Sequence, residues 1–518
     1  MNDQILKIIS NKEYQASNDE VRKNRFIIRC STFIIQYSIF FAFPCFAQTD
    51  SLTNVRQFTL EEIVQLALDR SPRALQAETR KEVAYWRWRS FRSNYRPQLA
   101  LEGRLPNFRR TNEAIRQEDG SFAFRRVANN LSDVYLTASQ SLGATGTEFF
   151  VSSGIERFDN FINDETTYSS RPARIGLRQS LFGFNELRWE RQVEPLYYEE
   201  ANRDYVVQRE EIAQDATERF FAVLLQQVNL ALAQKNLANN DTIFQIGQGR
   251  YNLGRITEDQ LLNLELNVMN SRQEVAQAQL ELETSTLELN SFVGLGEGQS
   301  LTVALPAGVP QFAIDDQVAV QQALANNPDM VSFQRRVREA ESEVARSRAQ
   351  NGFRADLEAT YGLTDRGTSF ADVYNNPENE QIVELGFRVP VLDWGRSKSR
   401  MKQAEAILKL ERYTVEQEQV NFQRGVYTQV RTFAMQRDQV KITEVADDIA
   451  QRRYDIAKQR YLIGKIDITD LSIALREKDE ARRRYIESLR DFWINYYEVR
   501  MLTLYDFAVG KALLQQEG

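Results

Sequence analysis

The chain has 518 residues, a formal net charge of −7 and no histidine. The absence of histidine excludes catalytic triads, general bases and zinc sites that depend on imidazole, so we expect no enzyme, no cofactor and no metal site. The excess of acidic residues argues against nucleic acid as a partner.

Residues 1–47 have the order of a secretory signal peptide. Basic residues precede an apolar run over 33–43, and Cys45-Phe46-Ala47 follows, with small residues at the two positions that determine cleavage. We expect cleavage after Ala47. The alternatives are an uncleaved membrane anchor and a lipid attached to Cys45. Cleavage would remove both cysteines and leave a chain without disulfides.

Short helices are predicted at two places where an acidic, amphipathic segment ends at a proline. One segment runs from Leu60 to Pro72 and the other from Ile314 to Pro328. Because proline stops one helix and suits the first turn of the next, each is expected to continue as a new helix, to about Tyr95 or Gln350.

Alternation of apolar and polar residues then indicates β-strands with two different faces. Such strands fit a membrane barrel that is filled with water, or a soluble sheet with one wet face. The clearest segments are 134–142, 174–181, 354–363 and 383–391.

The connections between these segments are polar and rich in asparagine, so surface loops are predicted over 109–130, 160–171 and 365–380. The first half of the chain is longer than the second half in this region. We therefore predict an additional hairpin in the first half, formed by 134–142 and 147–158.

Very long helices are predicted over 186–247 and 396–461, because proline is absent after Pro195 in the first and throughout the second. In the second, apolar residues recur every three to four positions. At 1.5 Å per residue, each is roughly 90 Å or longer. Each has a partner helix, over about 257–292 or 467–507. Thr257 and Asp467 are the expected N-caps of the partner helices.

The turns between the paired helices repeat each other. Arg250-Tyr251-Asn252-Leu253-Gly254-Arg255-Ile256 returns as Arg460-Tyr461-Leu462-Ile463-Gly464-Lys465-Ile466, and the strand ends at 179–184 and 389–394 keep the same offset. The repetition predicts a duplicated unit of strand, long helix, turn and long helix. We divide the chain into a signal peptide (1–47), a first structural repeat (48–310) and a second structural repeat (311–518).

In order and register, these features resemble the TolC-like outer membrane factor family. The resemblance rests on the duplication, the two Arg-Tyr-x-x-Gly turns, Leu-Phe-Gly-Phe at 181–184, Leu-Asp-Trp-Gly at 392–395, and the helix starts at Pro72 and Pro328. It implies a mixed α and β fold, in which three chains share one outer-membrane β-barrel. Each chain gives four strands, and the barrel continues as a long periplasmic α-helical barrel.

The resemblance also implies a function. The protein would be the outer-membrane exit duct of a tripartite efflux or type I secretion system, with outer-membrane lipids, a periplasmic adaptor protein and an inner-membrane pump as partners. The alternative is a periplasmic coiled-coil scaffold or binding protein with a soluble β-sheet. The sequence does not reveal whether the cargo is a drug, a metal or a protein.

Site residues follow from the same resemblance. Tyr461 matches a tyrosine of the family's pore gate and Asp470 matches an aspartate that narrows the pore, while Asp467 adds a charge nearby. A second aspartate, found in some members three residues on, is Ile473 here. The tips Leu253-Gly254-Arg255 and Ile463-Gly464-Lys465 match the places where the adaptor docks. Two simpler alternatives are that Asp470 only favours the helix dipole and that the glycines only cap helices.

Overall fold

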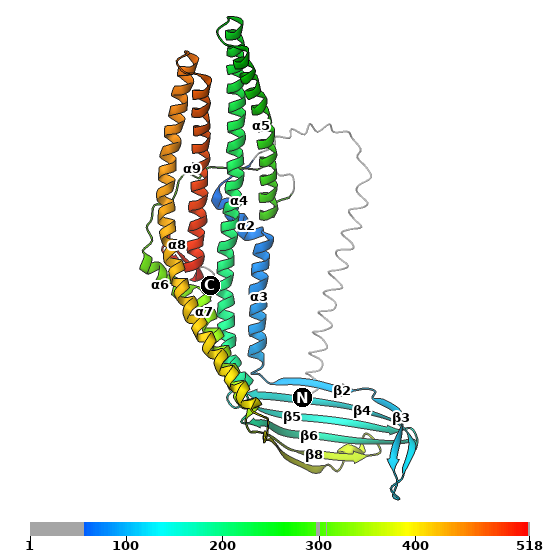
Figure 1. Ribbon diagram of the computed structural model, residues 1–518. Coiled ribbons are helices and arrows are strands. Elements are labelled where there is room, and N and C mark those ends of the chain that lie inside the picture. Colours follow the sequence, from blue (N-terminus) through cyan, green and yellow to red (C-terminus); the bar gives the residue numbers. More distant parts are fainter. Residues whose placement is uncertain (1–55, 297–300, 307, 516–518) are drawn as a thin grey trace, which may run out of the picture. The chain divides into compact units, whose positions relative to one another are not determined.

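The structure is a computed structural model that describes residues 56–296, 301–306 and 308–515. The predicted signal peptide and Cys45 lie outside the described residues. The described chain combines long helices with one large sheet, so its fold is mixed α and β, as the sequence predicts (Figure 1).

The chain begins with two consecutive helices that are separated at a proline. Helix α2 (Leu60–Arg70) starts with a capping box, in which the Glu62 backbone N–H donates to the Thr59 hydroxyl and the Thr59 N–H donates to the Glu62 carboxylate. Helix α3 (Pro72–Ser93) has Pro72 in its first turn. Its observed end lies close to the predicted one.

Seven strands then form a single antiparallel sheet. Strands β2 and β3 both pair with β4, one along each half of its length, so the sheet has six strand positions in the order β2/β3, β4, β5, β6, β8, β9. The strands are β2 (Gln98–Arg104), β3 (Phe108–Arg116), β4 (Phe122–Leu142), β5 (Thr147–Asn160), β6 (Glu165–Leu181), β8 (Arg354–Gly367) and β9 (Glu378–Arg388).

Two predicted loops and the implied number of strands need correction, and the third predicted loop is observed in its middle part. The predicted loop over 109–130 forms most of the β3–β4 hairpin, and much of 160–171 belongs to β6. Within 365–380, irregular backbone and a short 3-10 turn (Asp372–Tyr374) lie between β8 and β9, which take up the ends of that range. The family resemblance implies four strands from each chain, whereas the observed sheet has six strand positions. The additional hairpin is present, because β4 and β5 contain 134–142 and 147–158.

The rest of the chain is helical, apart from short strands. Strand β7 (Leu301–Val303) pairs in parallel with β1 (Arg56–Phe58), and β10 (Tyr505–Asp506) pairs with β11 (Lys511–Ala512). The helices are α4 (Glu186–Asn252), α5 (Glu258–Val293), α6 (Asp316–Asn326), α7 (Pro328–Asn351), α8 (Arg396–Leu462) and α9 (Ile468–Thr503).

The paired long helices have matching lengths. Helices α4 and α8 each contain 67 residues, and their partners α5 and α9 each contain 36. At 1.5 Å per residue, α4 and α8 are about 100 Å long. Because α4 starts directly after β6, and α8 soon after β9, the two helical turns lie at the ends of these helices that are remote from the sheet (Figure 1).

The main core lies where α2, α4, α5 and α9 meet. Ile63, Phe220, Leu289 and Phe492 are fully buried there, and the small β1–β7 sheet closes one side with Phe58 and Val303. Burying an apolar side chain of this size contributes about 1.5–3 kcal/mol relative to exposure. This cluster therefore holds the two helical hairpins, α4–α5 and α8–α9, together.

The apolar stripe of α8 divides into two parts. Val426, Val430 and Phe433 are buried, which accounts for the part of the stripe nearer the sheet. Farther along the helix, four aliphatic side chains at the same spacing stay exposed in the single chain, and they are Ile442, Val445, Ile449 and Ile456. Such a stripe requires lateral neighbours in water.

Candidate functional site

One face of the sheet is apolar and is termed the apolar face. Directly paired residues of neighbouring strands point the same way, so the register shows which side chains share it. Val383 on β9 is 76% exposed and Phe387 is 73% exposed. The face crosses all six positions and consists of Leu99, Leu101, Leu136, Ala138, Phe149, Val151, Ile175, Leu177, Ala359, Tyr361, Val383, Leu385 and Phe387.

The opposite face of the sheet is polar and charged. Arg178 on β6 lies between Glu148 on β5 and Glu358 on β8, with N–O distances of 3.8 and 3.5 Å. Arg174 lies four residues before Arg178 on the same face of β6, and its guanidinium nitrogen is 3.8 Å from a carboxylate oxygen of Glu358. A sheet with one apolar and one charged face suits a wall between lipid and water.

The two helical turns share one backbone geometry. Gly254 and Gly464 both have positive φ, at 65° and 74°, which side chains other than glycine rarely adopt. In each turn the glycine N–H donates to the carbonyl of the tyrosine three residues before it. The backbone N–H of the next residue, Arg255 or Lys465, donates to the carbonyl of the arginine five residues before it. These bonds are those of a helix C-cap.

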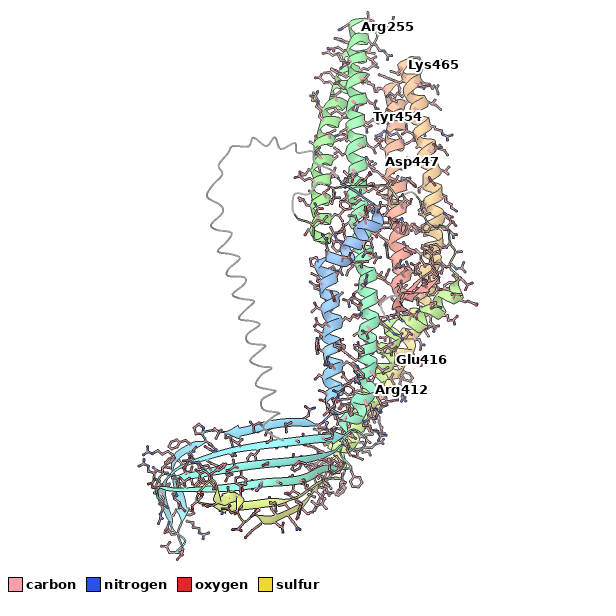
Figure 2. The ribbon with its side chains drawn as sticks, turned by 180° about the vertical axis from the view of Figure 1, so that it is seen from behind. Arg255, Arg412, Glu416, Asp447, Tyr454 and Lys465 are labelled. Atoms are coloured by element: carbon pink, nitrogen blue, oxygen red, sulfur yellow. The ribbon has the colours of Figure 1, made fainter. Side chains whose placement is uncertain are left out.

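The predicted docking residues lie at the two tips. Leu253 is 72% exposed and Ile463 is 67% exposed, although both are aliphatic. Arg255 and Lys465 follow the glycines, and Figure 2 shows them at the ends of the two hairpins. Each tip therefore presents one exposed aliphatic side chain beside one cation.

The predicted gate residues separate into different environments. Tyr461 is only 6% exposed and packs with Ile243, Leu264 and Leu471 in a cluster to which all four long helices contribute. The Arg250 guanidinium lies 5.6 Å from the centre of the Tyr461 ring. Burial raises the pKa of the Tyr461 hydroxyl, while the Arg250 charge opposes that shift.

The two aspartates have different local roles. Asp467 is the N-cap of α9, because its carboxylate accepts the backbone N–H of Asp470 at 2.9 Å. Asp470 lies in the first turn of α9 and is exposed. Thr257 caps α5 through a capping box. The structure thus confirms both predicted N-caps, and it shows Tyr461 buried and Asp470 exposed.

A polar network between the two hairpins was missed by sequence reasoning. Asn236 on α4 donates to the Asp479 carboxylate on α9 at 2.8 Å, and Asp479 pairs with the buried Lys478 at 2.9 Å. Asn239 on α4 donates to the Tyr454 hydroxyl on α8 at 3.0 Å. The signal was present in the sequence, because Lys478 and Asp479 interrupt the apolar stripe of α9.

Two hydrogen bonds of this network cross between the hairpins, from Asn236 to Asp479 and from Asn239 to Tyr454, whereas the Lys478–Asp479 pair lies within α9. A hydrogen bond to a charged group such as the Asp479 carboxylate contributes about 1.5–3 kcal/mol. Burial also raises the pKa of Tyr454, so its hydroxyl stays protonated and neutral at ordinary pH. Figure 2 shows Tyr454 set back from the tips marked by Arg255 and Lys465.

Solved structures show which known fold the chain shares. The chain is similar to the CmeC outer membrane channel of Campylobacter jejuni, with a TM-score of 0.62 and 13% identity, covering 86% of this chain and 85% of that chain. It is also similar to the outer membrane protein VceC of Vibrio cholerae, with a TM-score of 0.58 and 14% identity, covering 86% and 95%. The fold is that of outer-membrane channel proteins.

The family follows from the sequence profile. The profile of the outer membrane efflux proteins matches residues 63–295 and 319–500, so the chain belongs to this family. One relative, the alkaline protease secretion protein AprF of Pseudomonas aeruginosa, is 23% identical over 377 residues, which are 62% of this chain and 76% of the relative.

Family membership fixes the class of function. The protein is an outer-membrane channel for export, not an enzyme, and its helical part lies in the periplasm. It works as a homotrimer with a periplasmic adaptor and an inner-membrane pump. Among the described residues, none of the helices combines the length and apolar character needed to cross a membrane.

The capping role of Asp467 gives a first prediction. Asp467→Ala removes the acceptor for the Asp470 N–H and should destabilise the first turn of α9 by about 1 kcal/mol. Hydrogen exchange at residues 468–471 should become about fivefold faster. Asp467→Asn is the matched control, since it removes the charge but keeps an acceptor. Unchanged exchange in Asp467→Ala would show that the cap contributes nothing.

Proposed function

We propose that three copies of the chain close a single barrel whose apolar face meets outer-membrane lipid and whose charged face lines the duct. The open sheet is the observation that carries the proposal. Its two edges, β2/β3 and β9, have no further strand partner in the described chain. Unpaired backbone groups are too costly to leave in lipid, so a membrane sheet must close.

The barrel proposed here is wider than the resemblance implied. Six strand positions in each of three copies give eighteen in the closed barrel. Strands β2 and β9 run in opposite directions, because β2 leaves a helix and β9 leads into one, so neighbouring copies can pair antiparallel. Barrel diameter grows roughly in proportion to strand number, so this barrel would be about half again as wide as one built from four strands per copy.

The helices are proposed to continue the barrel as a tube across the periplasm. Support comes from the exposed stripe on α8, which needs neighbours from other copies. The division into two structural repeats, 48–310 and 311–518, is part of this proposal. Equal helix lengths in the two halves support it, although the first repeat supplies β2 to β6 and the second only β8 and β9.

The gate and the docking surface are proposed at the helical turns. Three exposed Asp470 carboxylates near the axis would form an acidic ring that favours cations. The buried Tyr461 would act indirectly, by holding the hairpins together in the closed state. The exposed tips Leu253-Gly254-Arg255 and Ile463-Gly464-Lys465 would receive the adaptor. Membership of the efflux family favours this account over a periplasmic scaffold with a soluble sheet.

Cross-linking of the sheet edges tests the closed barrel. Leu101→Cys on β2 combined with Val383→Cys, Leu385→Cys or Phe387→Cys on β9 should give disulfide-linked trimers for at least one pair, since bridged Cα atoms must lie within about 7 Å. The products are resolved on a denaturing gel without reductant.

The matched control for this experiment combines Leu101→Cys with Ile175→Cys on β6, an inner strand on the same face. This pair should stay monomeric on the gel. A result in which none of the β9 pairs links, although the protein reaches the outer membrane, would contradict the pairing of β2 with β9 between copies.

Ion selectivity tests the acidic ring. Asp470→Asn removes three charges per trimer at nearly constant volume, and each charge attracts a cation at contact by about 1 kcal/mol in water. The preference for cations should fall several-fold in planar-bilayer recordings. Asp467→Asn is the control for a nearby charge. Equal selectivity in wild type and Asp470→Asn would place the constriction elsewhere.

Docking is best tested beside the glycines, because any side chain at positive φ strains the turn itself. Ile463→Asp puts a charge on the exposed aliphatic surface and should weaken binding of the cognate adaptor by about tenfold, which is 1.4 kcal/mol. Leu253→Asp tests whether the adaptor binds the first turn as well as the second. Trimer assembly should stay normal in both variants, and unaltered adaptor binding in both would remove the docking proposal.

A further inference from the structure

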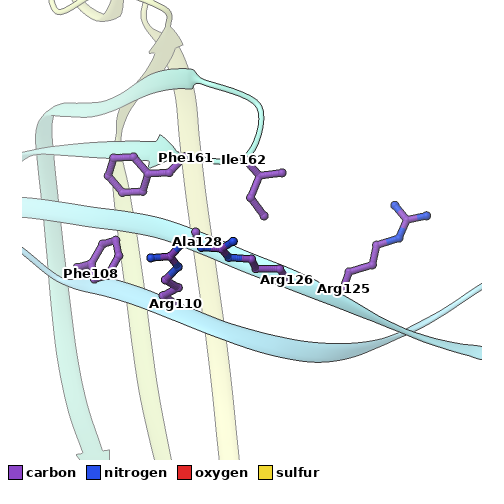
Figure 3. Close-up of a pocket in the computed structure, with 7 residues that line it drawn as sticks. All are labelled: Phe108, Arg110, Arg125, Arg126, Ala128, Phe161 and Ile162. Atoms are coloured by element: carbon purple, nitrogen blue, oxygen red, sulfur yellow. The ribbon is translucent and has the colours of Figure 1, made fainter.

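A basic and aromatic pocket lies at the end of the sheet that is remote from the helices. It has a volume of about 730 Å³ and is lined by Phe108, Arg110, Arg125, Arg126, Ala128, Phe161 and Ile162. The first five belong to the β3–β4 hairpin, and the last two belong to the turn between β5 and β6. Figure 3 shows the side chains of Arg110 and Arg126 beside Ala128, with Phe161 and Ile162 facing them from the turn.

Backbone and aromatic contacts hold the walls of the pocket in place. The Phe161 backbone N–H donates to the carbonyl of Ala128 at 2.9 Å, which fixes the turn against β4. The rings of Phe108 and Phe161 lie 5.6 Å apart. Strand β3 is paired with β4 along its whole length, so Arg110 lies directly opposite Ala128.

The pocket has an excess of positive charge. Arg110, Arg125 and Arg126 are exposed, and no ion pair joins any of them to a described carboxylate. Arg125 lies directly opposite Glu113 in the strand register, on the face away from Arg110 and Arg126. Of the acids on the neighbouring strands, Glu113 pairs with Arg109 and Asp159 pairs with Arg157. Two arginines without an ion-pair partner, Arg110 and Arg126, thus lie close together on one face of the hairpin, in a chain whose net charge is −7. Their natural ligand is an oxyanion, and arginine suits phosphate in particular.

The pocket continues the apolar face. Side chains alternate along β4, and its register with β2, β3 and β5 is continuous, so Ala128 and Arg126 share the face of Leu136 and Ala138. Phe122 and Phe124, at the tip of the hairpin, lie on this same face and are strongly exposed. The outer surface therefore changes from aliphatic to arginine and phenylalanine along one strand.

The distance along the strand gives the depth in the membrane. Gln140 pairs with Phe149, near the helix end of the apolar face, and Arg126 follows fourteen residues away on β4. At about 3.4 Å per residue and a tilt of about 40°, this corresponds to about 36 Å along the membrane normal. An outer-membrane apolar band is about 25 Å tall. Arg126 therefore reaches the layer of lipid headgroups.

We propose that this pocket binds the phosphorylated headgroup of an outer-leaflet lipid, with Arg110 and Arg126 contacting the phosphate and Phe108, Phe161 and Ile162 contacting its apolar part. The proposal rests on the channel spanning the outer membrane. The charge of the pocket, its apolar rim and its depth all suit an anionic amphiphile. A bound lipid would fasten the β3–β4 hairpin to the membrane beside the barrel mouth.

The experiment measures lipid binding to the purified full-length trimer in detergent by native mass spectrometry. The probes are lipid A that carries two phosphates and the same lipid without phosphate. Wild type should bind the phosphorylated lipid at least tenfold more tightly, and Arg110→Gln/Arg126→Gln should lose most of this preference. The matched control is Arg109→Gln/Arg157→Gln, which removes two arginines that already have ion-pair partners and should keep the preference.

Several results would overturn the proposal. Equal binding of the two lipids by wild type, or an undiminished preference in Arg110→Gln/Arg126→Gln, would remove the site. Displacement of the lipid by inorganic phosphate at the same concentration would indicate a site for free phosphate instead. Channel formation in bilayers that contain no lipid A is recorded in parallel. If the wild-type trimer conducts ions but does not bind the lipid, only this inference is refuted. If the wild-type protein forms neither a trimer nor a conducting channel, the proposed channel is refuted.

Discussion

The pairing of strand edges is the constraint on which the rest of this structure depends. A sheet that presents an apolar face to lipid cannot leave rows of backbone N–H and C=O groups unpaired. In this chain the edges are β2/β3 and β9, and in the proposed barrel other copies cover them. The strands also position the long helices, because α4 follows β6 and α8 follows β9 after short connections.

The long helices place the two helical turns far from the sheet. A rise of 1.5 Å per residue carries α4 and α8 about 100 Å from the sheet. Over that length the single chain is held by one large core around Phe220 and Phe492, by the polar network of Asn236 and Asp479, and by the small cluster around Tyr461. The core around Phe220 and Phe492 thus contains many more buried side chains than the cluster around Tyr461 near the tips.

The helical half of the molecule could be predicted closely from sequence, and the sheet less so. Gly254 and Gly464 marked the turns, and Thr257 and Asp467 marked the caps, because these signals are local. The β3–β4 hairpin was mistaken for a loop, since Arg109, Arg110, Arg125 and Arg126 obscure the alternation that identifies a strand in contact with lipid. Packing partners were also hidden: Tyr461 is buried by residues of four helices, and sequence order does not reveal that.

The width of the barrel is the central claim, and counting its strands is the most direct test. Cryo-electron microscopy of the purified channel in a lipid nanodisc would resolve the strands around the duct. The account predicts threefold symmetry and eighteen strand positions, with β2 of one copy beside β9 of the next. A closed barrel with only four positions from each chain, or a sheet that closes within one chain, would contradict it.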